Sequence, residues 1–151
     1  MDISNNAKKA RPSSTLSISS NANRMIDEGI DIVNFSAGEP DFNTPDYIKE
    51  AAIEAINDNF TKYTPYEGIV ELRQAVADDL KKNCDLDYTP EQIVISNGSK
   101  HAITNAFMAI LNPGDEVIVP APYWNSYIDI IELCYGVPVV VNTTKQNSFK
   151  V

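Results

Sequence analysis

Hydrophobic positions along this sequence form two kinds of segment, longer ones with helical spacing and shorter continuous runs of strand length. Apolar residues recur at helical spacing in 16–26, 45–59, 69–83, 98–111 and 124–134. Each of these segments is predicted to be an amphipathic helix, because positions three and four apart share one helical face. Shorter apolar runs have the length of strands and lie at 30–35, 93–96, 116–119 and 137–142.

Glycine, proline and small polar residues mark the ends of these segments. Gly29 follows the first helix as a predicted C-cap. Thr44 stands before Pro45, which predicts a helix with a threonine N-cap and proline at its first position. The turn-rich stretches 36–42 and 61–68 are predicted to be loops.

The order strand, helix, strand, helix, strand over 93–142 predicts a parallel α/β fold with right-handed crossovers. The runs at 117–119 and 137–141 are apolar throughout, which suits strands covered on both faces. A sheet of three short strands would have open edges. We therefore expect further strands of this sheet outside the chain.

Composition narrows the class of protein. A hydrophobic content of 43% fits a globular chain, and a net charge of −9 without a basic stripe argues against nucleic-acid binding. Cys84 and Cys134 match no metal or redox spacing, and a single histidine, His101, excludes a multi-histidine metal site. No apolar run is long enough for a signal peptide or a membrane span, so the cytoplasm is the expected location.

The stretch from Ile93 to Lys100 predicts an anion site. A strand-like run meets a polar, glycine-containing turn and then a helix, whose first amides have no partner within the helix. The helix macrodipole makes that end positive, so a phosphate can bind there. A purely structural turn fits the same pattern equally well.

Trp124, the single tryptophan, follows the run at 116–119 and a proline-rich turn. Ligands of open parallel sheets bind beyond the carboxyl ends of the strands, where an indole can cover a ring-shaped ligand. A tryptophan packed into the core at a helix start fits this pattern better when it is taken alone. Together, the turn at 97–100 and Trp124 indicate a phosphorylated aromatic cofactor.

Five motifs in order carry a resemblance to a known family. They are Asn34 to Phe42 (NFSAGEPDF), Tyr63 to Gly68 with Leu72-Arg73, Ser96 to Lys100 (SNGSK), Pro113 to Val117 (PGDEV) and Pro122 to Trp124 (PYW). In these motifs the chain resembles the class I/II, fold type I, pyridoxal-phosphate-dependent aminotransferases, and among them the bacterial-type aspartate aminotransferases. The resemblance runs from about residue 12 to the end and covers the N-terminal two-fifths of a family chain.

The resemblance implies pyridoxal 5′-phosphate as cofactor, an amino acid and a 2-oxo acid as substrates, aspartate first among the amino acids, and a homodimer. By position, it implies that Gly98, Ser99 and Lys100 bind the cofactor phosphate and that Trp124 stacks on the cofactor ring and borders the substrate. It also implies that Tyr63 reaches the phosphate of the other subunit, and that the Gly38 N–H binds the substrate carboxylate. Ser14 and Thr15 would border the substrate. Taken alone, Gly38 fits a turn glycine and Tyr63 a loop aromatic better; the joint match favours the site.

The chain is expected to divide into three parts. Residues 1–14 are polar and lack periodicity, which predicts a flexible arm that is ordered only where it packs. The resemblance implies an N-terminal helix and small-domain or substrate-loop segment at 15–44, and an incomplete cofactor-binding large domain at 45–151. It places the Schiff-base lysine, the acid beside the pyridine nitrogen and a carboxylate-binding arginine beyond Val151, so no catalytic residue is assigned. Lys100 belongs to the phosphate loop, and Arg73 is expected on a helix surface.

We therefore expect an N-terminal fragment of an aminotransferase that is inactive by itself. A non-catalytic remnant or interaction module on the same scaffold is the alternative. A binder of phosphate esters unrelated to pyridoxal is a third reading.

Overall fold

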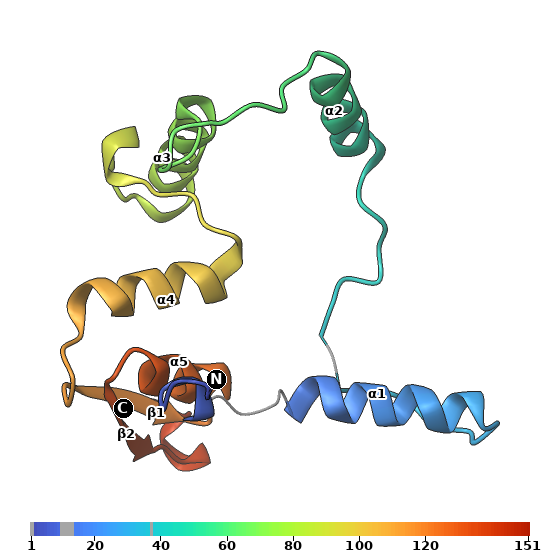
Figure 1. Ribbon diagram of the computed structural model, residues 1–151, viewed down its shortest axis with the longest axis vertical. Coiled ribbons are helices and arrows are strands. Elements are labelled where there is room, and N and C mark those ends of the chain that lie inside the picture. The colour runs from blue at the N-terminus through green and yellow to red at the C-terminus, as the bar shows by residue number, and fades with distance from the viewer. Residues whose placement is uncertain (1, 10–13, 37) are drawn as a thin grey trace. The chain divides into compact units, whose positions relative to one another are not determined.

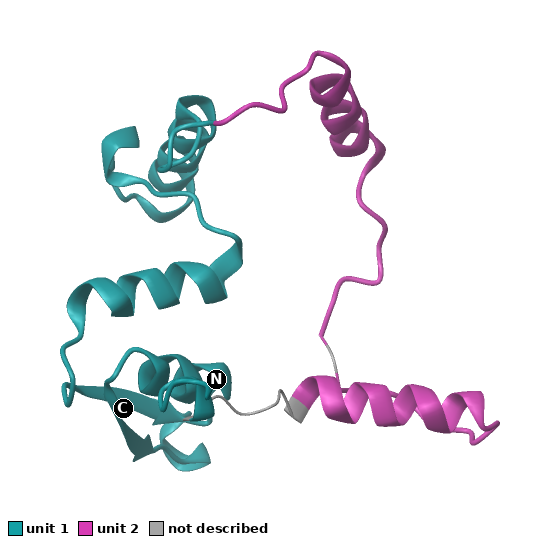
Figure 2. Ribbon diagram, in the orientation of Figure 1, with its two compact units in different colours: residues 1–11, 64–151 teal, residues 12–63 magenta. Residues whose placement is uncertain are grey.

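The structure is a computed structural model that describes residues 2–9, 14–36 and 38–151 (Figure 1). It divides into two compact units, residues 1–11 with 64–151 and residues 12–63 (Figure 2). Residues 10–13 of the predicted arm and Ala37 of the first motif lie outside the described residues.

The larger unit contains a parallel pair of strands. β1 (Glu116–Ala121) pairs with β2 (Val137–Asn142), in register from Glu116 opposite Val137 to Ala121 opposite Asn142. Helix α5 (Ser126–Leu133) connects them (Figure 1). The strands predicted at 116–119 and 137–142 and their parallel pairing are confirmed.

The core of this unit lies where α5 meets the two strands. Its buried residues are Val119, Ile130, Ile131 and Cys134, and Ile131 is 1% exposed. Gly136 follows the helix closely: a Cβ there would lie 3.0 Å from both Ile131 and Leu111 side-chain atoms. The helix therefore packs tightly at the point where the chain turns back into β2.

The helix predicted at 98–111 is present as α4 (Gly98–Ile110), and it contacts α5. The Cys134 thiol lies 3.8 Å from the Thr104 carbonyl oxygen of α4. After α4 the chain turns at 112–115, where the Asp115 carboxylate accepts a 2.7 Å hydrogen bond from the Asn112 N–H. This side-chain-closed turn leads directly into β1.

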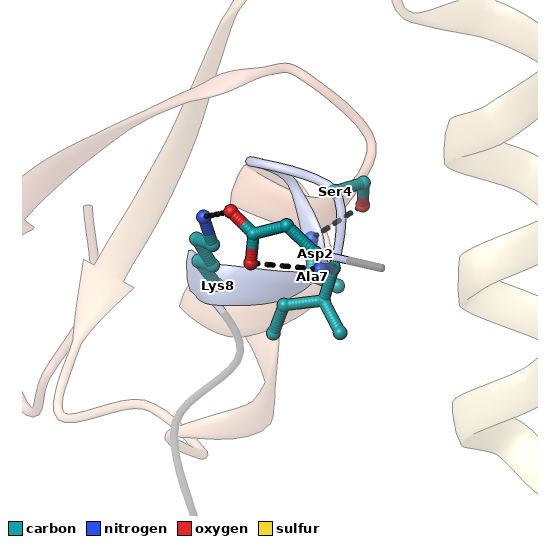
Figure 3. Close-up of polar contacts among 5 residues, drawn as sticks. Asp2, Ser4, Ala7 and Lys8 are labelled. Carbon is teal, nitrogen blue, oxygen red and sulfur yellow. Dashed lines mark hydrogen bonds and ion pairs between the residues drawn. The ribbon is translucent and has the colours of Figure 1, made fainter.

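Residues 6–9 of the predicted N-terminal arm pack on α5. The 3₁₀ helix η1 (Ala7–Lys9) contacts α5, and the Asn6 side-chain amide donates to the Leu133 carbonyl at 2.8 Å. Within the arm, Lys8 pairs with Asp2 at 2.8 Å and the Ala7 N–H donates to the Ser4 hydroxyl (Figure 3).

Helix α3 (Val70–Cys84) and the 3₁₀ helix η2 (Pro90–Gln92) pack together in the same unit, and Ala77 is buried there. α3 lies within a residue of the predicted helix at 69–83. η2 begins at a capping box, in which the Thr89 N–H donates to the Gln92 side chain at 3.0 Å.

Two predicted strands are wrong. Residues 30–35 and 93–96 are not in strands, so the predicted three-stranded sheet has two strands among the described residues. A strand needs a neighbouring ladder, which an apolar run does not itself provide. The Ile95 N–H bonds instead to the Glu67 carbonyl of a loop, at 2.8 Å.

The smaller unit contains helices α1 (Ser14–Asp27) and α2 (Asp46–Asn57) (Figure 2). Gly29 closes α1 as predicted, with its N–H bonded to the Ile26 carbonyl at 2.9 Å. The predicted threonine cap of α2 is wrong, since Pro45 is the N-cap residue and no side chain caps the helix. Instead Asp46 pairs with Lys49 at 2.6 Å across the first turn.

Candidate functional site

The candidate site begins at the first turn of α4. Gly98 opens the helix at φ +80°, a left-handed conformation that glycine adopts without strain. Its N–H donates to the Ser96 carbonyl at 2.8 Å, which makes the turn tight. No atom lies within 4 Å of the place where a Cβ of residue 98 would stand, so this side of the turn is open.

Two main-chain donors of this turn lack an acceptor. The Ser99 and Lys100 amides precede the first intrahelical hydrogen bond, and among the described residues neither amide has another acceptor. The Asn97 side chain does not cap the helix. Since the macrodipole adds positive potential here and residues 99 and 100 are exposed, these amides are suited to bind an anion. The Gly98 amide, predicted to join them, is already bonded.

His101 holds the turn from within the helix. Its Nδ1 accepts a 3.1 Å hydrogen bond from the Asn97 N–H. From the sequence, no role in the turn was predicted for this histidine; its position four residues after Asn97 was the available signal for the contact.

Trp124 lies in the loop between β1 and α5, two residues before the helix begins at Ser126. The Lys100 ammonium stands over its ring, 5.1 Å from the ring centroid. The Tyr127 ring meets it edge to face at 5.5 Å and 87°. Trp124 is 43% exposed, so a core tryptophan, the reading favoured by the local pattern, is wrong.

The structure therefore brings Lys100 and Trp124 together, with the open amides at the start of α4. Gly38 and Tyr63 belong to the unit at 12–63. A Cβ at Gly38 would have no neighbour within 4 Å, and the Tyr63 side chain is fully exposed. Ser14 and Thr15 open α1 of the same unit.

The sequence predicted that Arg73 lies on a helix surface. Arg73 does lie in α3, but its side chain is half-buried and contacts two loops. Its Nε donates to the Gly68 carbonyl at 3.1 Å and its Nη1 donates to the Pro90 carbonyl at 2.9 Å. Arg73 was recognised in the sequence as part of the motif that begins at Tyr63, but its hydrogen bond to the Pro90 carbonyl was not predicted. That carbonyl lies 17 residues further along the chain.

Two carboxyl groups beside Arg73 have depressed pKa values. The pKa of Glu67 is lowered chiefly by a hydrogen bond from its own backbone N–H, then by the Tyr66 hydroxyl, and least by the Arg73 charge. The pKa of Glu91 is lowered chiefly by the Thr89 hydroxyl, and Arg73 again adds the smallest part. Both carboxylates are therefore ionised at neutral pH.

The residues at the start of α4 fit a phosphorylated aromatic group. Two open amides, the positive helix end and the Lys100 ammonium suit a phosphate, and the half-exposed Trp124 ring suits a planar ring. The described residues contain no cluster of three histidine, cysteine or acidic side chains that could hold a metal ion. Nor does any described helix have the length and apolar character needed to cross a membrane.

A family model, aminotransferase class I and II, matches residues 30–151, and the chain belongs to this family. The resemblance read from the motifs is thereby confirmed. The match to solved aspartate aminotransferases described below also confirms the fold class, the N-terminal part of fold type I.

Individual relatives in this family are named as aspartate or aspartate/prephenate aminotransferases. The chain is 49% identical over 142 residues to a protein of Rhizobium leguminosarum bv. phaseoli named "Probable aspartate/prephenate aminotransferase", which covers 94% of this chain and 36% of that one. It is 43% identical to the aspartate aminotransferase of Bacillus sp. (strain YM-2), over 99% of this chain and 38% of the relative. The chain thus spans a little over a third of the length of these relatives.

Solved structures of aspartate aminotransferases are similar to this chain over nearly its whole length. The aspartate aminotransferase of Thermus thermophilus with maleate superposes with a TM-score of 0.94 at 42% identity, covering 99% of this chain and 39% of that one. The aspartate aminotransferase of Rhizobium meliloti gives 0.91 at 38% identity, covering 100% and 38%. The similarity extends over both units of the chain.

Proposed function

We propose that this chain supplies the phosphate-binding and substrate-loop part of a pyridoxal-phosphate-dependent aminotransferase that uses aspartate and a 2-oxo acid. The observation that carries the proposal is the open amide pair of Ser99 and Lys100 beside the exposed Trp124 ring. The names of the relatives, aspartate and aspartate/prephenate aminotransferases, support the choice of substrates.

In this proposal each residue holds or orients a part of the cofactor or substrate. The Ser99 and Lys100 amides and the Ser99 hydroxyl bind the phosphate, and the open side of Gly98 lets it approach the backbone. The Lys100 ammonium adds charge, and Trp124 covers one ring face and excludes water from it. When bound, pyridoxal phosphate supplies the electron sink for the carbanion at the substrate Cα.

Gly38 and Tyr63 have proposed roles that rest on their motifs. The Gly38 N–H binds the substrate α-carboxylate, where the absence of a side chain allows close approach. Tyr63, fully exposed on its loop, binds the phosphate of the partner in a homodimer. Cys84 and Cys134 are both free thiols, which supports the cytoplasm as the proposed location.

We further propose that the lysine that bonds the cofactor covalently is not among these 151 residues. Lys100 is the lysine of the proposed phosphate turn. Its ammonium lies over the Trp124 ring, where its proposed role is to add positive charge near the phosphate. In that case the chain binds the cofactor without covalent attachment and transfers no amino group by itself.

Binding of pyridoxamine 5′-phosphate to the 151-residue chain tests the proposed site, and the fluorescence of Trp124, the single tryptophan, reports it. The substitution Ser99→Pro removes one open amide and the Ser99 hydroxyl, at a position of the first helical turn where proline is tolerated. We expect it to weaken binding about tenfold to a hundredfold, the order of one to two hydrogen bonds to a charged group.

The matched control is Tyr47→Pro, which places proline at the same position of α2, the second helical residue. It should leave binding unchanged. If the wild-type chain binds no pyridoxamine 5′-phosphate, or if both proline variants bind as it does, the proposed phosphate site is wrong.

A further inference from the structure

Arg73 connects two loops that are distant in sequence. Its guanidinium donates to the Gly68 carbonyl at 3.1 Å and to the Pro90 carbonyl at 2.9 Å. A planar fork with several fixed donors suits such a double contact, whereas a lysine ammonium acts at one point. Among the described residues Arg73 has no ion-pair partner within 4 Å, so its donors serve these carbonyls.

The loop that Arg73 holds is itself locked to the segment leading into α4. The Glu67 carbonyl accepts the Ile95 N–H at 2.8 Å. Gly68 stands at φ +101°, and a Cβ there would lie 2.5 Å from the Ile95 Cγ1 atom. Backbone and side chain of Ile95 are thus both fixed against residues 67 and 68.

Ile95 is three residues from Gly98 and four from Ser99, whose amide is one of the open donors. The intervening turn has little freedom, because the Gly98 N–H bonds to the Ser96 carbonyl and the Asn97 N–H bonds to His101. A displacement of Ile95 is therefore transmitted to the start of α4.

From this chain of contacts we infer that Arg73 is a positioning residue for the phosphate turn. By holding the Gly68 and Pro90 carbonyls it fixes the loop at 65–68 against Ile95, and Ile95 fixes the direction in which the Ser99 and Lys100 amides point. The inference rests on the proposed phosphate site. It also explains why a half-buried arginine bonds to main-chain carbonyls rather than to an acidic side chain.

The test compares Arg73→Gln with Arg24→Gln. Arg24 is an exposed arginine of α1 that pairs with Asn21 on the same helix and with Glu28 directly after it, so its variant loses the same charge without linking two loops. Trp124 fluorescence measures the affinity for pyridoxamine 5′-phosphate and for pyridoxamine, which lacks the phosphate. We expect Arg73→Gln to weaken binding of the phosphorylated ligand about tenfold and to leave pyridoxamine binding unchanged.

Two further readouts separate positioning from general loss of structure. Hydrogen exchange at the Ile95 amide should speed up in Arg73→Gln and not in Arg24→Gln, because the Glu67 acceptor is no longer held. Arg73→Lys should restore part of the phosphate-dependent affinity, since one of the two carbonyls can still be bonded.

Gly68→Ala provides an independent variant in case Arg73→Gln does not fold. It leaves Arg73 in place but forces a Cβ against Ile95, and it should give the same phosphate-selective weakening. Equal loss of affinity for both ligands overturns the inference, and so does unchanged binding while exchange at Ile95 rises. If the wild-type chain binds no phosphorylated ligand, the proposed function fails together with the inference; wild-type binding with unchanged variants overturns the inference alone.

Discussion

Single polar groups in this chain act mainly on the backbone. His101 accepts the Asn97 N–H, Arg73 donates to two carbonyls, and the Asp115 carboxylate closes the turn before β1. Buried polar or charged residues are absent from the described part of the chain. At the residue scale, polar side chains therefore stabilise turns and do not form a buried charge network among the described residues. One of these turns presents the open amides.

The pKa of Glu67 gives a prediction at this scale. The Tyr66 hydroxyl lowers this pKa, and Glu67 in turn raises the pKa of Tyr66. Tyr66→Phe removes the hydroxyl alone, so the pKa of Glu67 should rise, and carboxyl carbon NMR titration measures it. Tyr88→Phe is the control and should leave that pKa unchanged. An unchanged Glu67 titration in Tyr66→Phe would contradict the contact.

The sign of the pH effect follows. The folded-state pKa of Glu67 is lower than its ordinary value of 4.5. Its contribution to stability is therefore fully present above that ordinary value and disappears as the pH falls through the folded-state pKa. Between these limits, Tyr66→Phe should make the free energy of unfolding less dependent on pH.

Candidate site residues were predictable from the sequence where their place beside a predicted strand or helix indicated them. The turn at 97–100 was recognised from its glycine and its place before a helix, and Trp124 from its place after a strand. The roles of Arg73 and His101 were not predicted. Arg73 depends on a carbonyl 17 residues away, which no local pattern contains. His101 depends on which rotamer its ring adopts toward residue 97.

At the scale of elements, every predicted helix is present, while two of four predicted strands are absent. Helices bond within themselves, so a periodic segment is enough to specify one. A strand is defined by a neighbour, and the runs at 30–35 and 93–96 have none among the described residues. β1 and β2 form because α5 brings one beside the other and covers the pair.

The packing of α5 gives a prediction for elements. Ile131, 1% exposed, lies between Gly136 and the strands, so Ile131→Ala leaves a cavity that should cost about 2–5 kcal/mol of unfolding free energy. Ile53→Ala makes the same change in α2, which buries no residue, and should cost less than about 0.5 kcal/mol. Urea unfolding of both variants measures the difference, and equal costs would show that α5 is not the core helix.

At the scale of the whole molecule, the core and the proposed phosphate turn lie in one unit, while Gly38 and Tyr63 lie in the other. The buried apolar residues of the described chain all belong to the unit that contains 64–151. In the proposed function, the main-chain contacts to the cofactor phosphate therefore come from the better packed unit alone. The proposed contacts to the substrate carboxylate and to a partner subunit involve Gly38 and Tyr63, which belong to the unit at 12–63.

This division predicts partial function. The purified 151-residue chain, given pyridoxal 5′-phosphate, aspartate and 2-oxoglutarate, should produce no oxaloacetate above the protein-free blank, because no lysine is assigned to bond the cofactor and move the Cα proton. A coupled malate dehydrogenase assay measures oxaloacetate, with an active class I/II aminotransferase as positive control. Borohydride reduction followed by mass spectrometry should label Lys100 no more than Lys49, an exposed lysine paired with Asp46. Amino transfer by the purified chain, or selective labelling of Lys100, would show that these 151 residues hold a complete catalytic site, and the proposed division of roles would then be wrong.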